Sequence, residues 1–339
     1  PYPSAIDAQQ FILDNGPTIS GAGATTGTLY FWEHWGGGSH VLAEYQGGYA
    51  TYNLSGGTPS ASLGTNDPDV ATGGTPTKIP GRYIPVAQGF FVTGEATGTI
   101  NFNNGQRVFE IEGSSSSVFV RDSESSSPTA NADNGDNRIK MRLGYDSPNS
   151  IHRQLLVTVD SRATQFIDWG FDALLIEDQM DDMYWMIENQ KYSIQGLDAI
   201  NESVVIPIGI HARDAGINSI SIDALVNFPT DLAVYLHDIE LDIYHDLRES
   251  AYQIHLEAGE YLDRFEITFT ARALSIEEFD TEQIDVSYTN DENSIVISNP
   301  NNIEIESVQI VNMIGQILSL IHISEPTRLE SKSRMTAYG

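Results

Sequence analysis

The sequence predicts an all-β protein, made of two β-sandwich (jelly-roll-like) modules followed by a truncated small β-sandwich domain. Many short runs place valine, isoleucine or aromatic residues on alternate positions, which is the period of a half-buried strand. Clusters of glycine, proline, asparagine and threonine separate these runs, a punctuation typical of sandwiches and barrels. In the first module only residues 5–15 have the spacing of a helix, with Ile6, Phe11 and Ile12 on one side.

The composition restricts the classes of partner. The chain has 339 residues, with 17 Lys and Arg against 47 Asp and Glu, which gives a formal net charge of −30. A chain this acidic repels the phosphates of nucleic acids and anionic lipids, so we expect neither as a partner. Cysteine is absent, which excludes disulfides and thiolate chemistry. No run of about 18 apolar residues occurs, so no membrane-spanning helix is predicted.

Residues 1–121 are predicted to form the first β module. Its expected strands are aromatic or β-branched runs at residues 28–35, 41–45, 48–54, 89–93, 99–102 and 118–121. Stretches rich in glycine, proline and asparagine, such as residues 55–59 and 66–77, are expected to be loops. Residues 122–137 carry too little apolar surface to fold alone, so a flexible linker is expected there.

Residues 138–271 are predicted to form the second β-sandwich module. Its expected strands are residues 138–143, 154–159, 183–186, 204–208, 219–223, 233–237, 243–247, 252–256 and 264–269. The last four are expected to form a meander, with turns near residues 238–242, 248–251 and 258–262. Alternation along residues 253–256 and 264–269 indicates strands with one buried and one solvated face.

A polar connector, residues 272–283, leads to a last β segment at residues 284–317. Two alternating runs, residues 294–298 and 303–311, are joined by Asn299-Pro300-Asn301-Asn302, which is strong turn chemistry. The segment is therefore predicted to be a small β-meander.

The order of motifs in this last segment resembles a known export signal. The string SIVISNP followed by VQIVNMIGQ is similar to the type A C-terminal sorting domain of the Bacteroidota type IX secretion system. The resemblance implies a cargo protein, secreted or held at the cell surface of a Gram-negative bacterium, with the type IX machinery as its partner. Upstream strings resemble modules of such cargo and extend the resemblance back to Pro1: PYPSAID, LYFWEHW, IPVAQGFFV and GEYLDRFEITF.

Both ends of the sequence are interpreted as edges of a fragment. No charged segment followed by an apolar one opens the chain, so a signal peptide is expected upstream of Pro1. Residues 318–328, LSLIHISEPTR, resemble the translation of a sequencing adapter. Residues 318–339 are therefore interpreted as a non-native tail and the sorting domain as truncated, with a natural amphipathic end as the alternative.

An aromatic cluster is the candidate carbohydrate-binding site. Tyr30, Trp32 and Trp35 could form a platform on which sugar rings stack, with Tyr30 and Trp32 on one face of their strand and Trp35 on the other. Three nearby tyrosines extend the cluster: Tyr45, Tyr49 and Tyr52. The alternative is that these rings fill the core, because aromatic side chains bury large areas.

Calcium is the one candidate cofactor. Acidic loops offer Asp67 and Asp69 in the first module and Asp133 and Asp136 in the linker, and Ca²⁺ prefers such oxygen ligands. A third acidic loop lies at residues 290–293. None of the three has the spacing of an EF-hand loop, so solvated loops without an ion are the alternative.

Two other groups could carry chemistry. In the run from His237 to Asp246, His237 and His245 are too far apart on one strand to share a zinc ion, but a turn at residues 239–242 would restore that option. Asp181 and Asp182 are adjacent, so on a strand they point to opposite faces and form no glycosidase pair alone. Solvated or structural roles are the alternative for both groups, and no nucleophile or Walker motif occurs.

These observations favour a non-catalytic, exported surface protein with an adhesion, matrix or stalk role and a C-terminal sorting signal. Two alternatives stay open. The chain could be the C-terminal accessory part of a larger secreted hydrolase, or a carbohydrate-binding module that uses Tyr30, Trp32 and Trp35. No catalytic residue is predicted.

Overall fold

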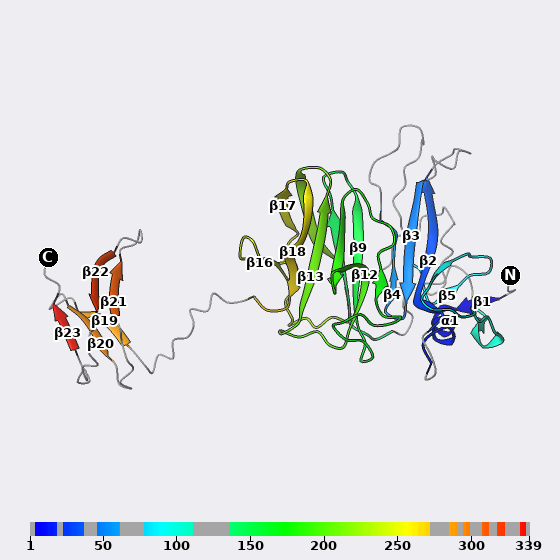
Figure 1. The fold of residues 1–339 in the computed structure, drawn as a ribbon, viewed down its shortest axis with the longest axis horizontal. Helices are drawn as coiled ribbons and strands as arrows, with labels where there is room; N and C mark the ends of the chain where they lie inside the picture. The colour runs from blue at the N-terminus through cyan, green and yellow to red at the C-terminus, as the bar shows by residue number, and fades with distance from the viewer. Residues whose placement is uncertain are drawn as a thin grey trace. The chain divides into compact units, whose positions relative to one another are not determined.

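The computed structural model describes residues 4–18, 23–36, 46–61, 78–110 and 136–271, with five further strands between residues 285 and 336. Within these ranges the chain consists mainly of β-strands, so the all-β prediction is confirmed (Figure 1). The chain divides into two compact units, Pro1–Ala271 and Arg272–Gly339. No helix in the described ranges has both the length and the apolar character needed to span a bilayer.

One large sheet forms the centre of the first unit. Its strands are β8 (Lys140–Asp146), β9 (His152–Val159), β10 (Ala173–Leu174), β11 (Asp182–Ile187), β12 (Gln190–Leu197), β13 (Val205–Ala212), β14 (Gly216–Val226), β15 (Tyr235–Asp238), β16 (Ile243–Asp246), β17 (Tyr252–Leu256) and β18 (Gly259–Thr268). They follow the order β16-β15-β18-β13-β11-β12-β9-β8-β14-β17, with β10 paired to β12 beside this path. The pair of β9 and β12 is parallel.

The two ends of this strand path meet, so the sheet curls into a nearly closed barrel. The Tyr252 hydroxyl on β17 donates to Asp238 Oδ2 on β15 at 2.9 Å, although β17 is one end of the path and β15 is next to the other end, β16. Alternate residues fill the interior: Met141, Leu143 and Tyr145 along β8 are fully buried. The core of this sheet is therefore built from alternate residues, although Lys140 and Arg142, which alternate with them on β8, are buried as well, on the other face of the strand.

The expected meander of the last four strands is wrong in its order. The turn at residues 239–242 does join β15 and β16 as a hairpin. However, β17 crosses to pair with β14, and β18 lies between β15 and β13. Turn residues specify that the chain reverses, but they do not specify which distant strand is paired. The expected turn at residues 258–262 is also wrong in part, because β18 begins at Gly259.

In its described residues, the N-terminal part of the first unit adds two smaller sheets, an α-helix and a short 3-10 helix (labelled η). Its elements are β1 (Ala5–Asp7), α1 (Ala8–Asp14), β2 (Thr25–Gly36), β3 (Gln46–Asn53), β4 (Gly56–Thr58), β5 (Tyr83–Ile84), β6 (Phe91–Gly94), η2 (Asn104–Gln106) and β7 (Arg107–Val108). The sheets have the orders β4-β3-β2-β6 and β5-β1-β7. The helix predicted at residues 5–15 forms only over α1, because Ala5–Asp7, with Ile6, form strand β1 instead. The Asp7 side chain caps α1 by accepting from the backbone N–H groups of Gln9 and Gln10. The strand expected at residues 99–102 is absent from this described stretch, where Ile100 and Phe102 are exposed in irregular chain.

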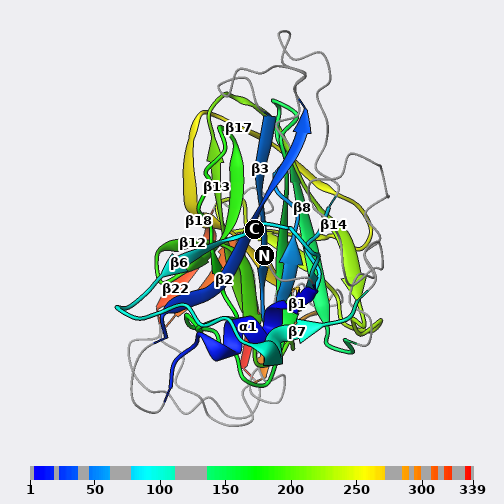
Figure 2. The same cartoon turned by 90° about the vertical axis from the view of Figure 1, so that its right-hand side faces the viewer.

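The N-terminal sheet packs directly on the large sheet, so residues up to 110 and residues 136–271 belong to one compact unit. Figures 1 and 2 show β2, β3 and β4 lying against one side of the large sheet. The Trp169 side chain is wedged there: its indole Nε1 donates to the Thr25 carbonyl at 2.6 Å. A Cβ at Gly16 would lie 2.3 Å from the Trp169 ring, so only glycine leaves room for it.

The second unit consists of paired antiparallel strands. They are β19 (Asp285–Thr289), β20 (Ser294–Ser298), β21 (Ser307–Val311), β22 (Ile317–His322) and β23 (Ser333–Thr336). They form the sheets β19-β20-β23 and β21-β22. The alternating runs at residues 294–298 and 303–311 therefore give β20 and β21. Residues after 317, interpreted from the sequence as a non-native tail, contribute β22 and β23 to this pairing.

Candidate functional site

The aromatic cluster of β2 and β3 splits between the core and the surface. Tyr30 is only 2% exposed, and its hydroxyl donates to the Leu174 carbonyl at 3.2 Å. Burial raises the pKa of Tyr30 to about 12, so the hydroxyl stays a donor. The ring of Tyr30 therefore lies in the core, which is the alternative that the sequence left open for this cluster. Tyr52 is buried as well, in the core beneath the N-terminal sheet.

Trp32 is partly exposed and belongs to a row of three aromatic side chains. Its ring centroid lies 5.1 Å from that of Tyr49, and Tyr49 lies 5.6 Å from Phe91, both edge to face. Trp32 and Tyr49 are half-buried, and Phe91 is 58% exposed. We call these three side chains the aromatic face. Trp35 lies in β2, but its side chain is outside the described residues.

The aromatic face spans β3, β2 and β6, and a segment from the large sheet borders it. The backbone N–H of Tyr49 donates to Glu177 Oε2 at 3.0 Å. Leu174 and Ile176 in the same segment are 41% and 46% exposed. The result is an aromatic and aliphatic surface with a carboxylate at its border. Such an exposed apolar patch is typical of binding surfaces.

Sequence reasoning missed the place of Phe91 in this face. The run 89–93 predicts a strand, and β6 occupies most of it. The pairing of Tyr30 with Phe91 brings the ring there, and that pairing joins residues 61 positions apart. To predict this position of Phe91, one would need to know which residues of both strands share a face and also the register in which the two strands pair.

The structure describes one of the four predicted calcium ligands, Asp136. Asp136 accepts from Arg138 Nη2 at 2.6 Å and lies 3.0 Å from Lys140 Nζ. Burial opposes ionisation of this carboxyl, but the bonds from Arg138 prevail and lower the pKa of Asp136. These basic partners occupy the carboxylate, which leaves little to attract Ca²⁺. Asp67, Asp69 and Asp133 lie outside the described residues, as does the loop at residues 290–293.

Asp181 and Asp182 are structural acceptors. Asp182 receives two bonds from Arg153, both at 2.7 Å, and the two side chains are 1% and 4% exposed. Asp181 accepts from Asn149 Nδ2 at 2.9 Å and from the backbone N–H of Arg213 at 2.8 Å. Neither carboxylate faces an open cleft. This matches the structural alternative for the pair.

The histidine-rich run forms the β15–β16 hairpin, with the turn that the zinc hypothesis required. His237 pairs with Tyr244 and His245 pairs with Leu236, so the two imidazoles lie on opposite faces of the hairpin. They cannot share one metal ion. Asp238 is fully buried; burial opposes its ionisation, but bonds from Arg264 and Tyr252 prevail and lower its pKa.

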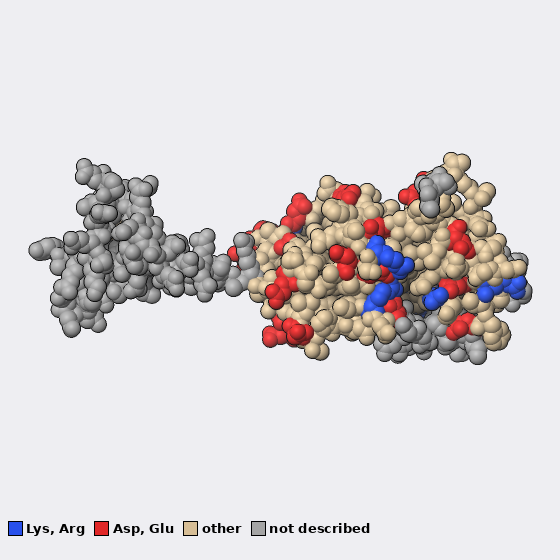
Figure 3. Space-filling view, turned by 90° about the horizontal axis from the view of Figure 1, so that it is seen from below, with Lys and Arg blue, Asp and Glu red and all other residues tan. Residues whose placement is uncertain are grey.

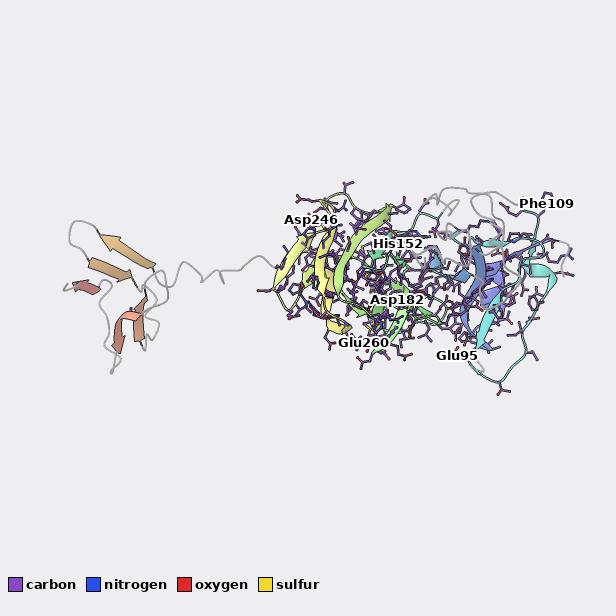
Figure 4. The ribbon with its side chains drawn as sticks, turned by 90° about the horizontal axis from the view of Figure 1, so that it is seen from above. Glu95, Phe109, His152, Asp182, Asp246 and Glu260 are labelled. Atoms are coloured by element: carbon purple, nitrogen blue, oxygen red, sulfur yellow. The ribbon has the colours of Figure 1, made fainter. Side chains whose placement is uncertain are left out.

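Charged side chains elsewhere in the described part of the first unit are dispersed or paired. Figure 3 shows acidic side chains scattered over one face, with basic side chains gathered in a few places. Figure 4 shows the labelled acids Asp182, Asp246 and Glu260 on separate strands, not converging on one point. In the described ranges, no group of three or more His, Asp or Glu side chains could hold a metal ion.

Comparison with protein families gives one match. A family model described as a domain of unknown function (DUF8693) matches residues 1–269. The match therefore covers the first compact unit almost to its last residue, Ala271. No curated protein and no solved structure matches the chain.

Proposed function

Because the chain belongs to the DUF8693 family, a family without an assigned function, we propose its function from its own residues: an exported, non-catalytic surface protein. In this proposal the first unit is the displayed body, with an adhesion, matrix or stalk role. The second unit carries the address for type IX secretion. The proposed location is the cell surface or the medium of a Gram-negative bacterium.

The observation that supports the proposal most is the agreement of two boundaries. The family match ends at residue 269 and the first compact unit ends at Ala271, and the segment whose sequence resembles a sorting domain, residues 284–317, lies after both. A signal that the secretion machinery binds is best placed on a unit separate from the body, because the body can then stay folded while the signal is bound.

A second line of support comes from the acids. Three of the described carboxylates that the sequence offers for chemistry, Asp182, Asp181 and Asp238, are engaged in ion pairs or backbone contacts. A hydrolytic pair instead needs two carboxyl groups across one cleft with separated pKa values. A non-catalytic role is therefore the simpler proposal for the described part of the body.

The export proposal is tested in a Bacteroidota host with a signal peptide placed before Pro1. Since the resemblance stops near residue 317, the body is followed in one strain by residues 272–339 and in another by a complete type A sorting domain. The protein with the complete domain is expected outside the cell, and a host without type IX secretion is expected to retain it. Equal export from both hosts would reject the type IX address.

The aromatic face supports a second candidate, carbohydrate binding by the body. Trp32, Tyr49 and Phe91 lie side by side at the surface, and Glu177 beside them can accept bonds from sugar hydroxyls. A glycan array compares the wild type with Trp32→Ala and Phe91→Ala. Phe109→Ala is the control, because Phe109, labelled in Figure 4, is 95% exposed and directly follows β7, which belongs to the sheet β5-β1-β7. Equal binding by wild type and both variants, or none by any, would remove this candidate.

A further inference from the structure

The hairpin β15–β16 holds a histidine whose ring is fixed on two sides. His237 Nδ1 lies 2.8 Å from Glu266 Oε1 on the neighbouring strand β18. Its ring stacks on Tyr244, with centroids 4.0 Å apart and an interplanar angle of 10°. The residue is only 8% exposed. The imidazole is therefore held in one orientation without any help from solvent.

The other ring nitrogen has no hydrogen-bond partner. His237 Nε2 is buried and unpaired, and the oxygen opposite it is Asp242 Oδ1 at 3.6 Å. Asp242 ends the turn with a left-handed backbone (φ 52°), and its side chain is 78% exposed. One carboxylate thus faces the imidazole from the solvent side.

The tautomer follows from Glu266. When the imidazole is neutral, a carboxylate at Nδ1 fixes the N–H there, so Nε2 carries the lone pair. A lone pair facing a carboxylate is unfavourable unless a positive charge, either a proton on Nε2 or a metal ion, lies between them. A carboxylate that orients a histidine through one nitrogen, while the other nitrogen binds a metal, is the usual support of a metal-ligating histidine.

We propose that His237 Nε2 and Asp242 bind one divalent transition-metal ion such as Zn²⁺, with Glu266 as the positioning residue. Two ligands at zinc distances and a tetrahedral angle are separated by roughly 3.4 Å, close to the observed separation. Water completes the coordination, because Asp242 is open to solvent. Imidazole nitrogen also selects against Ca²⁺, which prefers oxygen ligands throughout.

Neighbouring acids do not compete for this role. Glu240 Oε2 lies 2.6 Å from Arg264 Nη1, and Asp238 is bound by Arg264 and Tyr252. His245 lies on the opposite face and contacts the Ser250 carbonyl at 3.0 Å. This difference supplies a matched control: Glu240 and Asp242 sit in the same turn, but only Asp242 faces the free nitrogen.

The test is calorimetric titration of the full chain with Zn²⁺ alone at pH 7.5, with Ca²⁺ titrated in parallel. Asp242→Asn removes the charge and keeps a residue that tolerates the left-handed turn. This variant and His237→Gln are expected to weaken one Zn²⁺ equivalent by more than about tenfold, and Glu266→Gln to weaken it in the same direction. Glu240→Gln is expected to stay within about fivefold of wild type, the range for one exposed charge.

Three results would overturn the proposal. One is no Zn²⁺ binding to the wild type. Another is equal binding in wild type and Asp242→Asn, which would place the ion elsewhere. The third is an equal loss in Asp242→Asn and Glu240→Gln, which would reduce the effect to general attraction by the acidic surface. Asp242 is an exposed turn residue, so its variant stays folded and the comparison remains decisive.

Discussion

Arg153 and Asp182 form a bidentate ion pair in the first unit, with Nε–Oδ1 and Nη2–Oδ2 distances of 2.7 Å each. Arg153 also donates to the Glu177 carbonyl at 3.0 Å, and Glu177 borders the aromatic face. The pair therefore joins β9 and β11 to the segment beside that face. Its role is structural, and this gives the first prediction.

Replacement of Asp182 by Asn is expected to lower the free energy of unfolding by about 3–5 kcal/mol, because it leaves a buried guanidinium without its counter-ion. Urea denaturation measures the change. The double variant Arg153→Met/Asp182→Leu is expected to recover most of the loss, since an apolar pair needs no charge compensation. A single variant as stable as the wild type would contradict the role given to the pair.

The Trp169 wedge is expected to hold the N-terminal sheet on the large sheet. Trp169→Ala removes a large ring and its bond to Thr25, and should cost about 3 kcal/mol. Phe166→Ala is the matched control, because Phe166 is 67% exposed three residues away and should change stability by less than about 0.5 kcal/mol. Differential scanning calorimetry of the two variants and the wild type measures both changes in stability. An equal, small effect of the two variants would mean that the wedge does not couple the sheets.

Stability at alkaline pH depends on His152. Bonds to Asp146 and then to Asp223 raise the pKa of His152 to about 10. A histidine in an unfolded chain has a pKa of about 6.5. The ion pairs of His152 with Asp146 and Asp223 therefore contribute their full stabilisation below about pH 6.5, and this stabilisation is lost as the pH rises through about 10. Denaturation at pH 6.5 and 10 should therefore show a smaller decline for His152→Gln than for the wild type. His255→Gln, with the exposed His255 beside Glu257 at 3.8 Å, should decline like the wild type.

Acid stability depends on Asp160. Bonds from Arg162, together with those from Arg138, lower the pKa of Asp160 to about 2, against about 3.9 in an unfolded chain. This stabilisation is present above about pH 3.9 and is lost as pH falls through 2. Asp160→Asn should be less stable than wild type at pH 6, and the difference should shrink by pH 2. A difference that stays constant across this range would contradict the assignment.

The sequence predicts local features of this protein better than contacts between distant segments. Alternation along β8 and β14 predicts their strands, and the acidic turn before Ile243 predicts the β15–β16 hairpin. Arg138 and Lys140, which both form ion pairs with Asp136 in the structure, are only two and four positions away from it in the sequence. Basic residues two and four positions along the chain are thus a local signal against Asp136 as a calcium ligand.

Burial by segments distant in the sequence explains where the predictions from the sequence fail. Tyr30 and Trp32 share a strand face, as their parity predicts, yet only Tyr30 is covered, by a segment 144 residues further along the chain. The strand β12 is not among the expected strands, although Tyr192 and Ile194 alternate with Lys191, Ser193 and Gln195 as in a half-buried strand. The structure buries Ser193 and Gln195 nevertheless. Polar residues enclosed by tertiary packing leave no periodic signal of their burial.

We propose that Pro1–Ala271, one compact unit, is the body of the exported protein and that a separate signal after it directs export. The most direct measurement is the extracellular fraction of this body, behind a signal peptide in a Bacteroidota host, with and without a complete type A sorting domain. The account predicts folded protein outside the cell only when the domain is attached, and retention in the periplasm without it. Equal export of the body alone would contradict the account.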